Sequence, residues 1–207
     1  MVTDAASAAS PRLVFRGIMW VSGRLLAAER ILVAGLMALL TGLILLNVVT
    51  RYTRIPLYWI DEAAVYSVVF LTFVGASAMT RLRMDFAVTM LTERFSERWV
   101  GVAKVISTFI VLLFGLFLIW MCVLWLDPVG IARAGFDARK FSSETFNFIY
   151  TERTQTLNWP LWMLYMIMPF FAVCMTIHSI ANLLEELGLV PREQHANFLQ
   201  SNLEGIN

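Results

Sequence analysis

The chain has 207 residues, of which 59% are apolar and 15% are charged, and its mean hydropathy is +0.71. Soluble domains usually contain about 45–50% apolar and about 25% charged residues, so this composition is typical of a membrane protein. The formal net charge of +1 gives no sign of a nucleic-acid partner, and we expect none.

Four apolar runs reach the length of about 20 residues that a transmembrane helix needs. They cover residues 31–50, 58–80, 99–126 and 159–184. Each should be an α-helix, because the hydrocarbon core offers no other partners for the backbone of a single segment. The sequence therefore predicts an all-α integral membrane protein with four transmembrane helices and short interfacial helices. We divide it into an N-terminal segment (1–30), a four-helix membrane domain (31–187) with one long loop (127–158), and a tail (188–207).

The distribution of Lys and Arg predicts the orientation. Ten of the 16 basic residues fall on the side of the two termini, so both termini should be cytoplasmic and the long loop periplasmic. Residues 13–28 mix aromatic residues with Arg, and in residues 84–95 apolar residues recur at spacings of four, three and four. Both patterns indicate helices lying in the membrane interface. The alternative is that both segments simply continue the adjacent spans.

The inventory of chemically reactive groups is thin. No predicted span has an ionisable residue near its centre, and motifs of zinc proteases, serine hydrolases, phosphate-binding loops and paired cysteines are absent from the sequence. A lone His178 near the end of the fourth span is typical of an interface residue or a partner of the helix dipole. Cys122 and Cys174 should lie roughly 15 Å apart in depth, too far for a disulfide. We expect no enzyme, no cofactor and no metal.

Two adjacent acids, Asp61 and Glu62, open the second span. Pro56 suits the start of a helix, where the dipole favours negative charge by about 0.3–1 kcal/mol. This explains both acids without a function, and Trp59 beside them suits the interfacial aromatic belt. The alternative is a pair between Arg51 and Glu62 that ties the first helix to the second, with Asp61 facing elsewhere. The sequence leaves both interpretations open.

Two features suit packed helices. Pro169 should kink the fourth span, because proline removes one backbone hydrogen bond. Gly75, Ala76 and Ser77 form a small face on the second span that would let another helix approach closely. Four short-looped helices without polar groups facing a lumen make a poor conduit for a hydrophilic solute.

The spacing of several residues resembles a known family. The matching pattern is Asn47-x3-Arg51-Tyr52, then Pro56-Leu57-x-Trp59-x-Asp61-Glu62, then Gly75-Ala76 and Arg81, with residues 156–169 similar to the family's entry into its last helix. It is that of the small membrane subunit of tripartite ATP-independent periplasmic (TRAP) transporters, the DctQ family. One departure is Asp85-Phe86, where the family usually has a His-Ile pair.

The resemblance implies a function that the residues alone could not supply. It implies a scaffold that braces a large, DctM-like elevator subunit during sodium-driven uptake of an organic acid or related solute, which a periplasmic binding protein delivers. The location would be the cytoplasmic membrane of a bacterium or archaeon, with membrane lipids as further partners. The alternatives are a haem-bearing four-helix anchor or enzyme subunit, and a self-contained small transporter.

The resemblance also implies which residues matter. Those expected to be structural or to lie at the subunit interface are Asn47, Arg51, Trp59, Asp61, Glu62, Gly75 and Arg81, and we add Pro169. For contact with the binding protein we expect the long loop, especially Arg133, Arg139 and Lys140.

Overall fold

A computed structural model describes residues 3–83 and 97–192, with side chains described from Val14 to Arg83 and from Trp99 to Arg192. Its helices are α1 (Thr3–Tyr52), α2 (Tyr58–Leu82), α4 (Glu97–Leu126), α5 (Pro128–Arg133), α6 (Ala138–Thr145), α7 (Leu161–Tyr165) and α8 (Ile167–Glu186). Four stretches are long and apolar enough to cross a membrane: Val14–Tyr52, Tyr58–Leu82, Trp99–Arg133 and Leu161–Glu186. The all-α prediction with four spans is confirmed. The side on which the termini lie stays a prediction.

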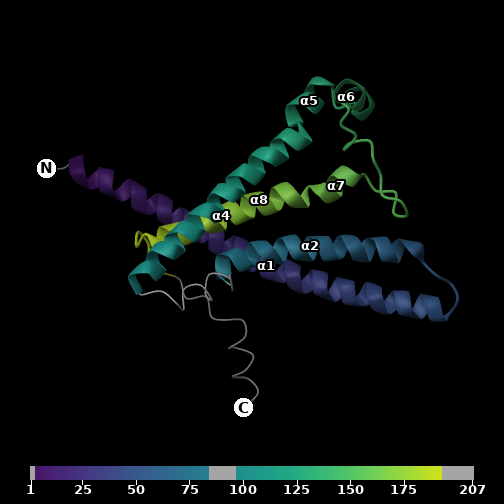
Figure 1. Cartoon of the computed structure of the whole chain (residues 1–207), viewed down its shortest axis with the longest axis horizontal. Coiled ribbons are helices and arrows are strands. Elements are labelled where there is room, and N and C mark those ends of the chain that lie inside the picture. Colours follow the sequence, from purple (N-terminus) through teal and green to yellow (C-terminus); the bar gives the residue numbers. More distant parts are fainter. Residues whose placement is uncertain (1–2, 84–96, 193–207) are drawn as a thin grey trace, which may run out of the picture.

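The spans form two pairs of helices, which we call arms: α1 with α2, and α4 with the span that ends in α8. α1 and α2 pack as a hairpin, α4 packs on α8, and α8 also contacts α2 and α1. Figure 1 shows the two arms converging around α8 near the N-terminal half of α1 and diverging toward the ends that carry α5, α6 and the turn between α1 and α2. The span that ends with α8 is the most buried of the four. Every other span is therefore held in place by α8.

α1 extends further than the sequence predicted. It is an unbroken helix, and its apolar part spans 39 residues, or about 58 Å at 1.5 Å per residue, nearly twice the hydrocarbon thickness of about 30 Å. The segment before residue 31 therefore continues the first span and is not a separate interfacial helix. The second expected interfacial helix (residues 84–95), the Asp85-Phe86 departure and most of the tail lie outside the described residues.

The fourth span is divided at Met166, between α7 and α8. The cause is Pro169, which has no N–H group to donate to the carbonyl of Tyr165 one turn earlier. The irregularity expected at this proline is present, as an interruption of the helix.

The long loop folds into a small cap on the end of α4. Asp127 caps α5 by accepting from the Gly130 N–H, and Asp137 caps α6 by accepting from two backbone N–H groups. Phe141 is buried against Ile131, with Tyr150 packed beside them. The Tyr150 hydroxyl donates to the Leu126 carbonyl at 2.6 Å. Burial raises the pKa of Tyr150, and the charge of Asp127 adds to this effect, so the phenol stays a donor.

α4 and α8 approach each other closely at Gly115. A Cβ built there would lie 2.5 Å from the Thr176 hydroxyl oxygen, because α4 and α8 nearly touch at this point. At Gly75, by contrast, a Cβ would meet nothing within 4 Å. Within this chain the small face expected on the second span therefore does not serve a close helix contact through Gly75.

We predict opposite effects for two Gly→Ala substitutions. Gly115→Ala should destabilise the purified protein by about 1–3 kcal/mol, because the added methyl group overpacks the contact with Thr176. Gly75→Ala should leave stability unchanged or raise it, because the site is open and Ala favours a helix. Thermal unfolding in detergent measures both; equal effects at the two sites would contradict the packing described here.

Candidate functional site

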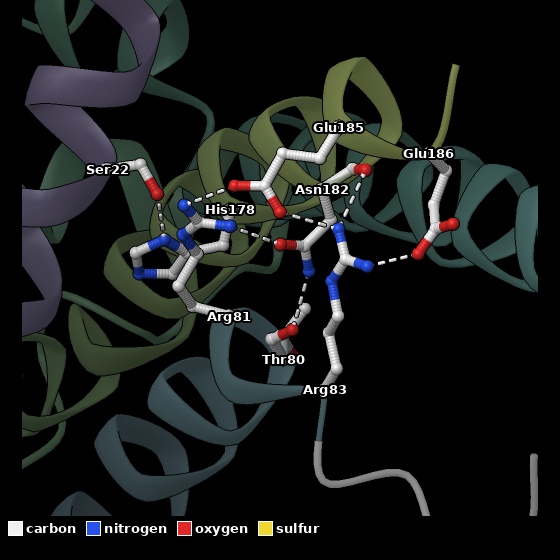
Figure 2. A network of polar contacts seen from close by, with 8 residues as sticks. All are labelled: Ser22, Thr80, Arg81, Arg83, His178, Asn182, Glu185 and Glu186. Atoms are coloured by element: carbon white, nitrogen blue, oxygen red, sulfur yellow. Dashed lines mark hydrogen bonds and ion pairs between the residues drawn. The ribbon is translucent and has the colours of Figure 1, made fainter. Parts of the chain in front are cut away.

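Two clusters of polar side chains lie at opposite ends of α2. The rim cluster, where α2 begins, consists of Asn47, Arg51, Asp61 and Glu62. The buried cluster, where α2 ends, consists of Ser22, Glu29, Arg81, Arg83, His178, Asn182, Glu185 and Glu186. Most members of the buried cluster are drawn in Figure 2.

Asp61 joins α2 to α1. Its two oxygens accept from Asn47 Nδ2 at 2.6 Å and from Arg51 Nη2 at 2.9 Å. Arg51 Nε also donates to Asn47 Oδ1 at 3.0 Å, so the three side chains form a closed ring. Asn47 and Arg51 lie one turn apart on α1 and therefore point the same way. The side chains of Arg51 and Asp61 are 62% and 48% exposed, and such exposed pairs contribute about 0–1 kcal/mol.

Glu62 holds a different element. Its carboxylate accepts from the backbone N–H groups of Gln155, Thr156 and Leu157 at 2.8–2.9 Å, and from the Thr156 hydroxyl. Three successive N–H groups turned to one anion form a nest that fixes the chain just before α7. Of the two interpretations that the sequence left open, the pair between Arg51 and Glu62 does not form, because Arg51 pairs with Asp61 instead. Successive residues of a helix point in different directions, so Asp61 binds α1 and Glu62 binds the loop.

The centre of the buried cluster is Arg81. Its side chain is 1% exposed and donates to Asn182 Oδ1 at 2.7 Å and to Glu185 Oε1 at 2.8 Å. Asn182 in turn donates to the Thr80 carbonyl at 2.7 Å. Figure 2 shows these contacts joining the end of α2 to the last turns of α8. Buried charges are costly unless they are paired and hydrogen-bonded, and Arg81 and Glu185 meet that condition through each other.

Arg83 completes the pairing from the cap of α2. It adopts a left-handed conformation (φ 55°) just after the helix. Its guanidinium donates to Glu185 Oε2 at 2.7 Å and to Glu186. Burial lowers the pKa of Arg83, while the charges of Glu186 and Glu185 oppose this effect. Two guanidinium groups thus face two carboxylates, which balances the charge of this part of the cluster.

His178 ties α8 to α1. It has no exposed surface, and its ring nitrogens form hydrogen bonds with Ser22 Oγ (2.8 Å) and Glu29 Oε2 (3.1 Å). This corrects our expectation of an interface or dipole role for His178. Glu29, also fully buried, belongs to a segment that we had placed before the membrane domain.

Sequence reasoning missed six of the eight members of the buried cluster: Ser22, Glu29, Arg83, Asn182, Glu185 and Glu186. One signal was available. His178, Asn182 and Glu185 recur at i, i+4 and i+7, which places three polar groups on one face of an otherwise apolar helix.

Three residues of the buried cluster are of the types found in the active site of a hydrolase, but a substrate cannot reach them. Ser22, His178 and Glu29 resemble a catalytic triad in composition. Ser22 is fully buried, so a substrate cannot reach its hydroxyl group. Both nitrogens of His178 make hydrogen bonds within the protein, which leaves neither free to ligate a haem iron. Among the described residues, no three His, Cys, Asp or Glu side chains are placed to hold a metal. The arrangement fixes helices.

The remaining predicted residues lie apart from both clusters or at their edge. Trp59 is 39% exposed at the start of α2. Arg133, Arg139 and Lys140 are exposed on α5 and α6. Cys122 and Cys174 are free and buried, in agreement with the expectation that they form no disulfide.

We predict unequal costs for breaking the two ion pairs. Arg81→Gln leaves the buried Glu185 without its full partner and should destabilise the protein by about 3–5 kcal/mol. Arg51→Gln breaks the exposed pair and should cost less than about 1 kcal/mol. Unfolding in detergent followed by size-exclusion chromatography measures both. Equal losses would show that burial does not decide the strength of these contacts.

A second prediction separates the two acids of the rim cluster. Glu62→Gln puts an amide nitrogen against the nest of N–H donors, so hydrogen exchange at residues 155–157 should accelerate at least tenfold, the loss of about 1.4 kcal/mol of protection. Asp61→Asn is the matched control and should leave exchange at these amides unchanged. Mass-spectrometric hydrogen exchange tests this, and unaltered protection in Glu62→Gln would refute the assignment of Glu62 to the loop.

The comparison with known proteins agrees with this geometry. The sequence matches the protein family described as "Tripartite ATP-independent periplasmic transporters, DctQ component" over residues 40–188. The match includes the rim cluster and all of α2, α4 and α8, but begins after Ser22 and Glu29. Neither the curated proteins nor the solved structures gave a match. The chain belongs to the DctQ family and is the small membrane component of a tripartite ATP-independent periplasmic transporter.

Proposed function

We propose that this subunit is a static brace for the large, DctM-like subunit of a sodium-driven transporter in the cytoplasmic membrane. The large subunit would carry the solute, an organic acid or a related compound, by an elevator movement. A periplasmic binding protein would deliver the solute. The observation that carries the proposal is that the charged groups of both clusters hold this chain's own helices together.

A brace needs a fixed angle between its parts, and the clusters supply two fixed points. The buried cluster joins α1, α2 and α8 where the two arms converge. At the diverging ends, Glu62 holds the loop that leads into α7. These contacts oppose both sliding and opening of the arms while a neighbouring domain moves.

A brace also needs a broad surface for its partner. The most apolar stretches of the first and third spans are only 6% and 17% buried within the chain. Such surfaces are covered by lipid or by another membrane protein. Gly75 is half-buried, and an added Cβ there would meet nothing within 4 Å. It suits close contact with a helix of the large subunit, because small residues let membrane helices approach.

The cap formed by α5 and α6 is the proposed contact for the binding protein. Arg133, Arg139 and Lys140 project from short helices that are anchored to α4 through the Tyr150–Leu126 hydrogen bond. Charges on an anchored element can steer a soluble partner into a fixed register.

Reconstitution tests the proposal. Proteoliposomes that contain this subunit alone should show no solute flux, and those that contain the large subunit and the binding protein as well should show sodium-dependent uptake. Flux through the isolated chain would contradict the brace function and favour a self-contained transporter.

Charge reversal at Arg133, Arg139 and Lys140 tests the contact surface in the same system. The triple reversal to Glu should slow uptake at least tenfold at limiting binding protein, because steering is lost, while the membrane complex still co-purifies. Arg192→Glu at the other end of the bundle is the control. Full uptake by the triple variant would remove the cap from the docking surface.

A further inference from the structure

The N-terminal half of α1 has two faces with different chemistry. Its buried face carries Ser22 and Glu29, which bind His178 of α8. Its exposed face carries Arg16, Trp20 and Arg24. These three residues are spaced at i, i+4 and i+8, so they lie along one side of the helix. We call them the cationic stripe.

The cationic stripe is ordered around its indole ring. Trp20 is 64% exposed although it is a large aromatic residue. The guanidinium carbon of Arg24 lies 5.5 Å from the centroid of this ring, within the range of a cation–π contact. That contact holds Arg24 beside Trp20, and its donors remain turned toward the surroundings.

Negative charge is absent from this face in the described part of α1. Between Val14 and Tyr52 the sequence contains a single carboxylate, Glu29. Its side chain is only 1% exposed and is turned toward His178. From Val14 onward, the charged groups on the exposed side of this half of the helix are therefore all positive, and an anion could approach the stripe without repulsion from this stretch of helix.

The position of the stripe along α1 places it at the level of lipid headgroups. Arg24 lies 28 residues before Tyr52, or about 42 Å along the helix. The full thickness of a bilayer with its headgroups is about 40–45 Å. When Tyr52 is at one surface, Arg24 is therefore at the opposite one, with Trp20 and Arg16 just beyond. Tryptophan is enriched at this depth, because its ring is apolar while its N–H can contact water.

We propose that the cationic stripe binds the headgroup of an anionic phospholipid in the leaflet next to the N-terminal end of α1. Arg16 and Arg24 would hold the phosphate, since a guanidinium group donates two parallel hydrogen bonds to phosphate oxygens. Trp20 would lie against the glycerol region. This inference depends on membrane insertion and is independent of the proposed role in transport.

Lipid binding at this point has a structural consequence. The turn that follows Trp20 carries Ser22, and Glu29 lies two turns further on, so the stripe and the contacts to His178 share the same stretch of helix. A lipid held by the stripe anchors this stretch to the membrane surface. The anchor passes through His178 to α8, the helix that contacts every other span.

Native mass spectrometry of the full chain in detergent tests the proposal, with phosphatidylglycerol as the probe and phosphatidylethanolamine as the reference lipid. The wild type should bind phosphatidylglycerol more tightly. The double variant Arg16→Gln/Arg24→Gln should bind it about 25-fold more weakly, because each guanidinium near an anionic surface contributes about a factor of five. Binding of phosphatidylethanolamine should not change.

Two further variants make the result specific. Lys104→Gln/Arg192→Gln removes the same charge from the same end of the bundle but not from α1, and it should bind phosphatidylglycerol like the wild type. Arg16→Lys/Arg24→Lys keeps the charge and should retain most of the binding, which also controls for folding. Equal binding of the two lipids by the wild type would overturn the proposal. Equal loss in the Lys104→Gln/Arg192→Gln control would overturn it too. So would an Arg16→Gln/Arg24→Gln variant that keeps its lipid binding but no longer co-purifies with the large subunit, because that result would point to an acidic protein partner.

Discussion

The buried contact of Arg81 with Glu185 and Asn182 is the interaction on which the rest of the structure depends. It fixes the end of α2 against α8, and α8 is the helix that touches all three other spans. A guanidinium and a carboxylate that are each 1% exposed have no water to replace a lost partner. Their pairing therefore permits little variation in the angle between the two arms, because any other arrangement leaves a charge uncompensated in an apolar surrounding.

The polar contacts at the two ends of α2 differ in how much they contribute to stability. At the rim, Asp61 and Arg51 remain in contact with solvent or headgroups, so their pairing orients the helices without adding much stability. Glu62 is more specific, because it accepts hydrogen bonds from three successive backbone N–H groups of the loop that precedes α7. At the buried end the same residue types are enclosed by helices, and there they specify a single packing. A chain whose charges are used in this way suits the fixed part of a transporter of the family to which it belongs.

Much of the fold was predictable from the sequence, because hydropathy reports directly on the burial of backbone in lipid. The four spans and the irregularity at Pro169 follow from local chemistry, and the resemblance to the family drew attention to Arg81. The partner of Arg51 was not predictable. Asp61 and Glu62 are neighbours, and the choice between them depends on how α2 is rotated against α1, which hydropathy does not contain. Ser22 and Glu29 were missed because the uninterrupted apolar run of the sequence begins at residue 31, whereas α1 includes both residues and turns them toward His178.

The central claim is that the two arms keep one fixed arrangement while the transporter works. Electron-electron distance measurements test this most directly, with spin labels at the exposed positions Tyr52 on α1 and Ser143 on α6, and with Cys122 and Cys174 replaced. In the assembled transporter, the account predicts one narrow distance distribution that is the same with and without sodium and solute. A second population, or a shift of the mean distance when sodium and solute are added, would contradict it.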